Sequence, residues 1–277
     1  MRILNVDNNY QKALNKNPNF NAWQRTVYRK VQQVSYSDAI NHFQTPMVQI
    51  VEEVQHRNDT FFFRDGSFWN SLSNYLAEKY RDISKVNVYN YACSNGSETY
   101  TFLMSLFSHF KEDFVKKFLP ILAKDYDAEA IEFAKSHILP ISEHEVSNIR
   151  AFTNGQFERF FESGQDFDIY CNANYPVKKE LIDSVVFTKA NVLNDCKNIE
   201  PNNSVVFVRN FWPYLSGDNQ LKLAKNLYNQ LQKNATVVIG QYDLMDNRYV
   251  KQADDLLINE GFKAVLDSEL LGLVYEK

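Results

Sequence analysis

The stretch Tyr91–Tyr100, YACSNGSETY, decides the fold, because it joins an apolar run to a segment with helical character. The preceding residues, Val86–Asn90 (VNVYN), are β-branched and aromatic, which is typical of a buried strand. The following residues, Thr101–Phe110 (TFLMSLFSHF), continue as a helix. The stretch holds one glycine, Gly96, where a phosphate-binding loop has several. We interpret it as a strand-to-helix turn that brings small polar groups and the carboxylate of Glu98 to a ligand.

After this turn, short β-branched runs alternate with segments of helical periodicity. The predicted strands lie within residues 86–92, 118–125, 185–191, 204–210, 235–243, 261–267 and 271–277. Helices are predicted within residues 128–138 and 218–232. This alternation predicts an α/β fold with a doubly wound, mostly parallel sheet covered on both faces. Only a short polar piece separates the last two runs, so we expect them to pair as a hairpin at the end of the sheet.

The N-terminal part of the chain has a different pattern. Apolar residues recur there at helical spacing, namely Trp23, Val27, Val31, Val34, Val48, Val51 and Val54. We predict a small helical domain over residues 1–56, followed by the main domain over residues 57–277. At the start of the main domain, Asp65 and Gly66 form a turn, and the apolar stripe beginning at Phe68 predicts a helix directly after it.

Composition narrows the class of protein. A chain of 277 residues with 44% apolar side chains can bury a sizeable core. It has no run of roughly 18 apolar residues, and its first residues lack the apolar segment of a signal peptide, so we expect a cytoplasmic protein without membrane insertion. Cys93, Cys171 and Cys196 lie far apart, which favours reduced thiols and no metal site. The net charge of −4 argues against nucleic acid and favours a small-molecule or protein substrate. We expect a monomer.

The turn and the next strand predict the ligand. In an open parallel sheet, ligands bind at the carboxyl ends of the strands, near the point where the strand order reverses. Asp125 ends the second predicted strand and is placed to accept hydrogen bonds from both hydroxyls of a ribose. Glu98 near a helix start disfavours a pyrophosphate and favours an ammonium group by charge complementarity. A nucleoside with positive charge is therefore expected, and S-adenosylmethionine fits this description.

The same segments, in matching order from about residue 58 to about residue 240, resemble the CheR-type protein-glutamate O-methyltransferases. NDTFFFRD, starting at Asn58, resembles the family's N-x-T-x-F-F-R motif, and ACSNGSETY, starting at Ala92, resembles A-x-S-T-G-E-E-P-Y. KDYDAEAIEFA, starting at Lys124, resembles the acidic motif D-I-D-x-x-x-L-x-x-A. VVFTKANVL, starting at Val185, resembles V-x-F-x-x-x-N-L-L, and VRNFWPYL, starting at Val208, resembles C-R-N-V-x-I-Y-F.

The resemblance implies a class I, Rossmann-like methyltransferase with a small N-terminal helical domain and an inserted β subdomain over about residues 138–184. It implies methyl transfer from S-adenosylmethionine to a glutamate carboxylate of a protein, such as the cytoplasmic region of a chemoreceptor, without a metal. Arg64 and Tyr214 are implied as catalytic residues close to the methyl-transfer point. The implied cofactor-binding residues are Asn58, Thr60, Arg64, Ala92, Ser94, Gly96, Glu98, Asp125, Tyr126, Asn191, Val192 and Asn210.

Plainer interpretations exist for single residues. Glu98 could serve only the helix dipole, and Asp127 fits a helix N-cap better than a ligand. Asn191 and Asn210 end strands, where asparagine is a common turn residue. Arg64 could form a surface ion pair.

Two alternative functions also fit the sequence. The same fold could methylate a small molecule or a different protein. A protein that binds S-adenosylmethionine or S-adenosylhomocysteine without catalysis, and acts through protein contacts, is the alternative from another class.

Overall fold

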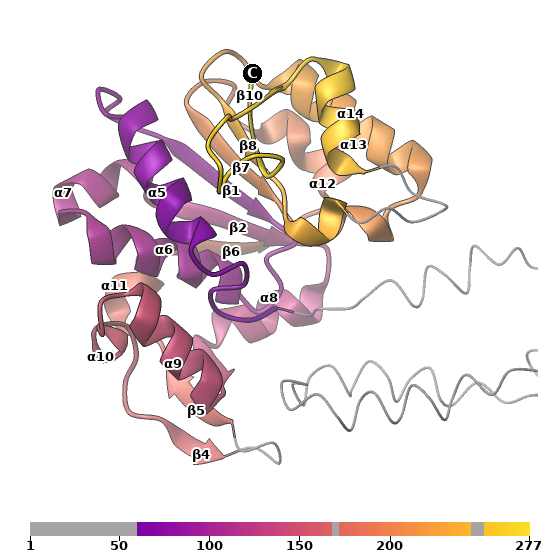
Figure 1. Cartoon of the computed structure of the whole chain (residues 1–277). Coiled ribbons are helices and arrows are strands. Elements are labelled where there is room, and N and C mark those ends of the chain that lie inside the picture. The colour runs from indigo at the N-terminus through magenta and orange to yellow at the C-terminus, as the bar shows by residue number, and fades with distance from the viewer. Residues whose placement is uncertain (1–59, 168–171, 245–251) are drawn as a thin grey trace, which may run out of the picture.

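The computed structural model describes residues 60–167, 172–244 and 252–277 (Figure 1). The predicted helical domain over residues 1–56 and the predicted site residue Asn58 lie outside this part of the chain. The strands are β1 (Asn87–Tyr91), β2 (Ile121–Asp125), β3 (Ile138–Ile141), β4 (Gln165–Phe167), β5 (Ala173–Pro176), β6 (Val185–Lys189), β7 (Ser204–Val208), β8 (Thr236–Val238), β9 (Lys263–Ala264) and β10 (Val274–Glu276).

The helices keep the numbering of Figure 1. The α-helices are α5 (Phe68–Lys79), α6 (Ser97–His109), α7 (Glu112–Val115), α8 (Ala128–Lys135), α9 (Glu143–Phe152), α10 (Phe157–Phe160), α11 (Lys179–Ile182), α12 (Val192–Asp195), α13 (Gly217–Gln230) and α14 (Ala253–Glu260). The short 3-10 helices are η1 (Lys116–Phe118), η2 (Cys196–Asn198), η3 (Trp212–Tyr214) and η4 (Gln241–Leu244). None of the helices in the described ranges is long and apolar enough to cross a membrane.

The main sheet has seven strands in the order β6-β2-β1-β7-β8-β10-β9. From β6 to β8 every neighbouring pair is parallel, while β10 pairs antiparallel with both β8 and β9. The predicted parallel sheet and its terminal hairpin are therefore confirmed. Because the chain leaves β1 for β2 on one side and reaches β7 on the other, the strand order reverses at β1. The carboxyl end of β1 is the point where such sheets bind ligands.

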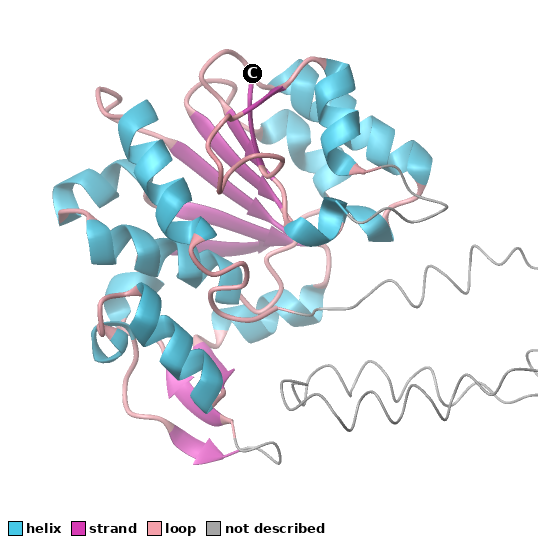
Figure 2. Cartoon of the chain, in the orientation of Figure 1, coloured by secondary structure: helices cyan, strands magenta, loops and turns pink. Residues whose placement is uncertain are grey.

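Helices cover both faces of the sheet (Figure 2). All five residues of the central strand β7 are buried, and because alternate residues of a strand point to opposite faces, both faces of the sheet must be covered there. Val205 and Phe207 pack in one apolar cluster with side chains of α5 and α6. Val206 and Val208 pack in a second cluster with side chains of α13 and α14. The doubly wound arrangement predicted from the sequence is confirmed.

A second, three-stranded antiparallel sheet has the order β3-β5-β4. It lies apart from the main sheet in Figure 1, next to α9. Its strands fall within the segment 138–184 that the resemblance implied as an inserted subdomain. Ser142 begins α9 with a capping box, in which Ser142 accepts from the backbone N–H of Glu145 and the Glu145 side chain accepts from the backbone N–H of Ser142.

The turn before α5 places Arg64 beside the main sheet. Phe63, Asp65 and Gly66 all have positive φ angles, of 50°, 71° and 55°. Two hydrogen bonds hold this compact turn: Gly66 N donates to the Phe63 carbonyl at 2.9 Å, and Trp69 Nε1 donates to the Arg64 carbonyl at 2.6 Å. The helix follows directly after Asp65 and Gly66, as predicted, and it buries Phe68 and Trp69.

The strand-to-helix turn after β1 depends on Gly96. This glycine has a φ of +92° and precedes the first residue of α6. A Cβ atom at this position would lie 2.8 Å from Cζ of Phe187, a ring on β6, the strand next to β2 at the sheet edge. The turn therefore needs glycine both for its backbone conformation and for the close packing of the helix on the sheet.

Gly96→Ala is expected to lower the free energy of unfolding by about 2 kcal/mol, because overpacking and a positive φ act together. Urea-induced unfolding measures this loss. Gly217→Ala is the matched control, since no atom lies within 4 Å of the Cβ it would add. The control should leave stability unchanged or raise it by up to about 1 kcal/mol. Equal stability of the two variants would contradict this role of Gly96.

Candidate active site at the carboxyl edge of the sheet

A cavity of about 440 Å³ opens where β1, β2, β6 and β7 end. The predicted site residues that line it are Thr60, Arg64, Ala92, Ser94, Glu98, Asp125, Tyr126, Asn191, Val192, Asn210 and Tyr214. Gly96 does not line the cavity and instead shapes the turn beneath it. Residues not predicted as part of the site complete the wall, namely Phe61, Trp69, Tyr91, Ala190, Leu193, Arg209, Phe211, Leu215 and Asn219.

Asp125 is held rigidly at the end of β2. Its carboxylate is almost completely buried, and one oxygen accepts the backbone N–H of Ser94 at 2.8 Å. The other oxygen accepts the backbone N–H of Asp127, also at 2.8 Å. Each oxygen of a carboxylate can accept more than one hydrogen bond. Asp127 itself caps α8 by accepting from Glu129 N, which confirms its interpretation as an N-cap.

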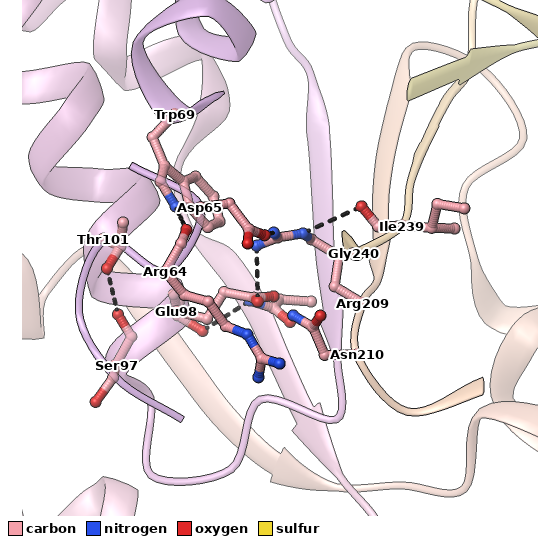
Figure 3. A network of polar contacts seen from close by, with 12 residues as sticks. Arg64, Asp65, Trp69, Ser97, Glu98, Thr101, Arg209, Asn210, Ile239 and Gly240 are labelled. Carbon is pink, nitrogen blue, oxygen red and sulfur yellow. Dashed lines mark hydrogen bonds and ion pairs between the residues drawn. The ribbon is translucent and has the colours of Figure 1, made fainter. Parts of the chain in front are cut away.

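Glu98 lies in the first turn of α6 and forms an ion pair that the sequence did not predict. Oε2 of Glu98 accepts from Nη1 of Arg209 at 2.8 Å, and Nη2 of the same guanidinium contacts Asp65 (Figure 3). Burial raises the pKa of Glu98, whereas the positive charges of Arg209 and Arg64 act to lower it. Arg209 was noted in the VRN motif but not as a site residue. The available signal was a charged side chain directly after the apolar run Val205–Val208 of the buried strand β7.

Asn210 follows Arg209, and a hydrogen bond from its own backbone N–H holds it in place. It has a φ of 61°, and its N–H donates to Oδ2 of Asp243 at 2.6 Å. Asp243 also accepts from the N–H groups of Gly240 and Trp212. Burial raises the pKa of Asp243 to about 7, although these N–H donors favour its ionised form. Among the described residues, the buried Oδ1 of Asn210 has no hydrogen-bond partner, and it packs against Gly240, where an added Cβ atom would lie 2.1 Å from it.

Asp243→Asn is expected to lower the free energy of unfolding by about 1–2 kcal/mol, because an amide cannot accept all of these backbone N–H bonds. Since Asp243 sets the backbone of Asn210, the affinity for S-adenosylhomocysteine should fall as well. Urea unfolding and calorimetric titration measure the two effects. Gln241→Ala, at an exposed position two residues earlier, serves as the control and should change neither quantity. A variant as stable as the wild type would show that Asp243 does not hold this loop.

The short helix α12 forms the wall at β6. Asn191 caps it by accepting from Leu193 N at 3.0 Å, so this residue is a turn residue and also lines the cavity. Asp195 ties the helix to the sheet, because it accepts from the Tyr91 hydroxyl at 2.6 Å and pairs with Lys124 at 2.5 Å. These contacts fix the apolar wall against β1 and β2.

Arg64 and Tyr214 line the same cavity but come from distant parts of the chain, the turn before α5 and the short helix η3. The guanidinium of Arg64 lies 5.6 Å from the ring centre of Phe61, and its side chain extends past Glu98 toward Asn210 (Figure 3). The ring of Tyr214 lies 5.8 Å from that of Tyr242. The cavity thus combines carboxylates at its base with an arginine and aromatic rings along its wall.

Neither the cysteines nor other ligand types form a metal site in the described ranges. Cys93 and Cys196 are buried free thiols, and Cys171 lies outside these ranges. The described residues contain no group of at least three His, Cys, Asp or Glu side chains that could hold a metal ion.

Comparisons with known proteins identify the family to which the chain belongs. The family described as CheR methyltransferase, SAM binding domain, matches residues 58–255. The chain is 23% identical over 216 residues to the chemotaxis protein methyltransferase of Borreliella burgdorferi, covering 74% of this chain and 72% of that protein. It is 24% identical over 193 residues to chemotaxis protein methyltransferase 2 of Vibrio cholerae serotype O1, covering 68% and 62%.

A solved structure, the magnesium protoporphyrin IX methyltransferase of Synechocystis PCC 6803 with bound SAM, matches with a TM-score of 0.41 and 10% identity. The match covers 93% of this chain and 91% of that one. The family match spans most of the chain and includes every strand that borders the cavity. The chain therefore belongs to the CheR methyltransferase family and is an S-adenosylmethionine-dependent methyltransferase.

Proposed function

We propose that this protein transfers the methyl group of S-adenosylmethionine to a glutamate side chain of a protein, and that the cytoplasmic region of a chemoreceptor is the substrate. The observation that carries the proposal is the cavity in which Asp125, Glu98 and Arg64 converge. The names of the relatives from B. burgdorferi and V. cholerae, both chemotaxis protein methyltransferases, support the substrate. Such a substrate would place the protein in the cytoplasm. We expect it to act as a monomer, which sedimentation equilibrium checks.

The residues of the cavity fit this cofactor. Asp125 offers carboxylate oxygens for the ribose hydroxyls, and Glu98 offers a negative charge for the ammonium group. Oδ1 of Asn210, buried without a partner among the described residues, supplies a further acceptor. Val192 and Phe211 provide apolar surface for the base. The ligand set thus matches a nucleoside that carries an amino-acid end.

The reaction requires positioning more than proton transfer. When bound, S-adenosylmethionine supplies a methyl group on a positively charged sulfur: a C–O bond forms as the C–S bond breaks, and the thioether leaves neutral. A glutamate carboxylate is already ionised near neutral pH, so no general base is needed. Holding two reactants in line can contribute about 7–11 kcal/mol at best. In this protein, the side chains that line the cavity would hold the two reactants in line.

Arg64 is the group suited to orient the acceptor. Its planar guanidinium can bind a carboxylate through two parallel hydrogen bonds, which fixes the direction of the attacking oxygen. Too tight a pair would stabilise the ground state and slow the attack. Tyr214 adds an aromatic wall and a hydroxyl at the same cavity. An aromatic ring next to the sulfonium would stabilise its positive charge.

A methyl-transfer assay tests the proposal. The full chain is incubated with S-adenosylmethionine carrying a labelled methyl group and with purified cytoplasmic fragments of chemoreceptors. We expect label in the fragments that is released as methanol in mild base, because carboxyl methyl esters hydrolyse under these conditions. Fragments with glutamine in place of the candidate glutamates are the control and should stay unlabelled. Cofactor binding without transfer to any acidic protein would contradict the proposal and favour a non-catalytic binder.

A further inference from the structure

Three charged side chains form a buried cluster (Figure 3), and two of them, Glu98 and Arg209, also line the cavity. Asp65 comes from the turn before α5, Glu98 from the first turn of α6, and Arg209 from the end of β7. Arg209 donates from Nη1 to Glu98 at 2.8 Å and from Nη2 to Asp65 at 2.5 Å. Its Nε donates to the carbonyl oxygen of Ile239, the residue directly after β8, at 3.3 Å. One guanidinium thus joins three separate parts of the chain.

The Arg209 side chain is completely enclosed. It is 0% exposed, compared with 9% for Asp65 and 13% for Glu98. Its guanidinium carbon lies 4.5 Å from the ring centre of Trp69 and 4.9 Å from that of Phe68, so aromatic rings replace water around the charge. Arg209 lines the cavity, but none of its side chain is accessible to solvent, and its guanidinium hydrogen bonds go to Glu98, Asp65 and Ile239.

We propose that Arg209 is a positioning residue with two arms, one fixing the Glu98 carboxylate for the ammonium group of the cofactor and the other fixing the turn that carries Arg64. The inference rests on the proposed function, and it adds a link between the cofactor's amino-acid end and the group that orients the acceptor. Neither arm follows from the sequence, because each joins residues more than a hundred positions apart.

The charge balance of the cluster supports the first arm. Asp65, Glu98 and Arg209 together carry one net negative charge, and Arg64 is a second positive charge that acts on Glu98. Without Arg209, Arg64 would be the remaining positive charge opposing the repulsion between Glu98 and Asp65. Burial alone raises the pKa of Glu98, and Arg209 is the strongest of the charges that oppose this rise. Arg209 therefore favours the ionised form of Glu98 and holds its carboxylate in place.

The backbone of the Arg64 turn supports the second arm. Phe63 and Asp65 adopt the left-handed region, which is unfavourable for residues other than glycine. Tertiary contacts must hold such a turn, and they include the Asp65–Arg209 pair and the hydrogen bond from Phe63 N to Thr101 Oγ1 of 3.1 Å. Loss of the Asp65 contact would loosen the segment in which Arg64 lies, although the hydrogen bonds from Gly66 N to the Phe63 carbonyl and from Trp69 Nε1 to the Arg64 carbonyl remain.

Arg209→Lys tests the first arm, because lysine keeps the charge but cannot reproduce the planar fork. Calorimetric titration compares S-adenosylhomocysteine with 5′-methylthioadenosine, which has the nucleoside but lacks the amino-acid end. We expect affinity for S-adenosylhomocysteine to fall on the order of tenfold and affinity for methylthioadenosine to stay the same. Equal losses for both ligands, or no loss for either, would overturn the inference. A wild-type protein that binds neither ligand would overturn the proposed function itself.

Asp65→Asn tests the second arm and leaves the Glu98–Arg209 pair in place. Asp65 does not line the cavity, so affinity for S-adenosylhomocysteine should stay within about twofold while kcat falls on the order of tenfold. Ser67→Ala is the control in the same turn, since Ser67 is exposed and makes no capping hydrogen bond. An unchanged kcat in Asp65→Asn, or a loss of affinity equal to the loss of kcat, would refute the second arm.

Discussion

Asp125→Ala is expected to weaken the binding of S-adenosylhomocysteine by about 1.5–3 kcal/mol, the range for hydrogen bonds to a charged group. The carboxylate is fixed by the N–H groups of Ser94 and Asp127, so it meets a ribose without reorganisation. Its removal loses both the ligand contacts and this rigidity. Calorimetric titration of wild type and variant at the same pH and salt concentration gives the difference directly.

The control for this prediction is Asp127→Ala. Asp127 caps α8 with its side chain, while its contact with Asp125 is made by the backbone and is kept in the variant. The variant should lose about 1 kcal/mol of folding free energy and keep its affinity. Thermal unfolding of Asp125→Ala should be measured as well, because two buried N–H groups lose their acceptor. Unchanged affinity in a folded Asp125→Ala protein would mean that the ribose binds elsewhere.

Arg64→Ala is expected to lower kcat about 100-fold, the effect of misplacing a reactant by roughly 1 Å. Affinity for the cofactor should change much less, because Asp125, Glu98 and Asn210 remain in place. Steady-state kinetics with a chemoreceptor fragment, together with titration of S-adenosylhomocysteine, separate the two quantities.

Arg64→Lys separates the effect of the positive charge from that of the planar pair of donors. Lysine keeps the positive charge at the cavity but offers a point charge in place of a planar pair of donors. We expect partial recovery of kcat relative to alanine and no change in cofactor affinity. Equal losses of turnover and affinity in Arg64→Ala would assign Arg64 to the cofactor alone and leave the acceptor without its orienting group.

The architecture of the main sheet could be predicted from the sequence because its signal is local. Each strand is a short β-branched run, and β7 is buried on both faces as its uninterrupted SVVFV sequence indicates. The alternation with helices then fixes a parallel sheet, and the short final connection fixes the hairpin. The inserted sheet was expected only through the resemblance, since its strands are short and lie between helical segments.

The site was predictable where a residue's place in the chain determines its position in space. Asp125 lies at the end of one predicted strand and Asn210 at the end of another, so the carboxyl edge of a parallel sheet had to bring them together. The supporting contacts were not predictable, because they join distant segments: Arg209 lies 144 residues from Asp65 and 111 from Glu98. Asp243 likewise reaches Asn210 across 33 residues. No local pattern encodes such pairs.

The central claim is that a nucleoside with an ammonium-bearing tail binds at the carboxyl edge of the sheet, between Asp125 and Glu98. A crystal structure of the full chain grown with S-adenosylhomocysteine tests it most directly. The account predicts density for one ligand, with its ribose hydroxyls on Asp125 and its amino group on Glu98. A ligand bound away from these two carboxylates, or a cavity that takes up a phosphate-bearing nucleotide in preference, would contradict it.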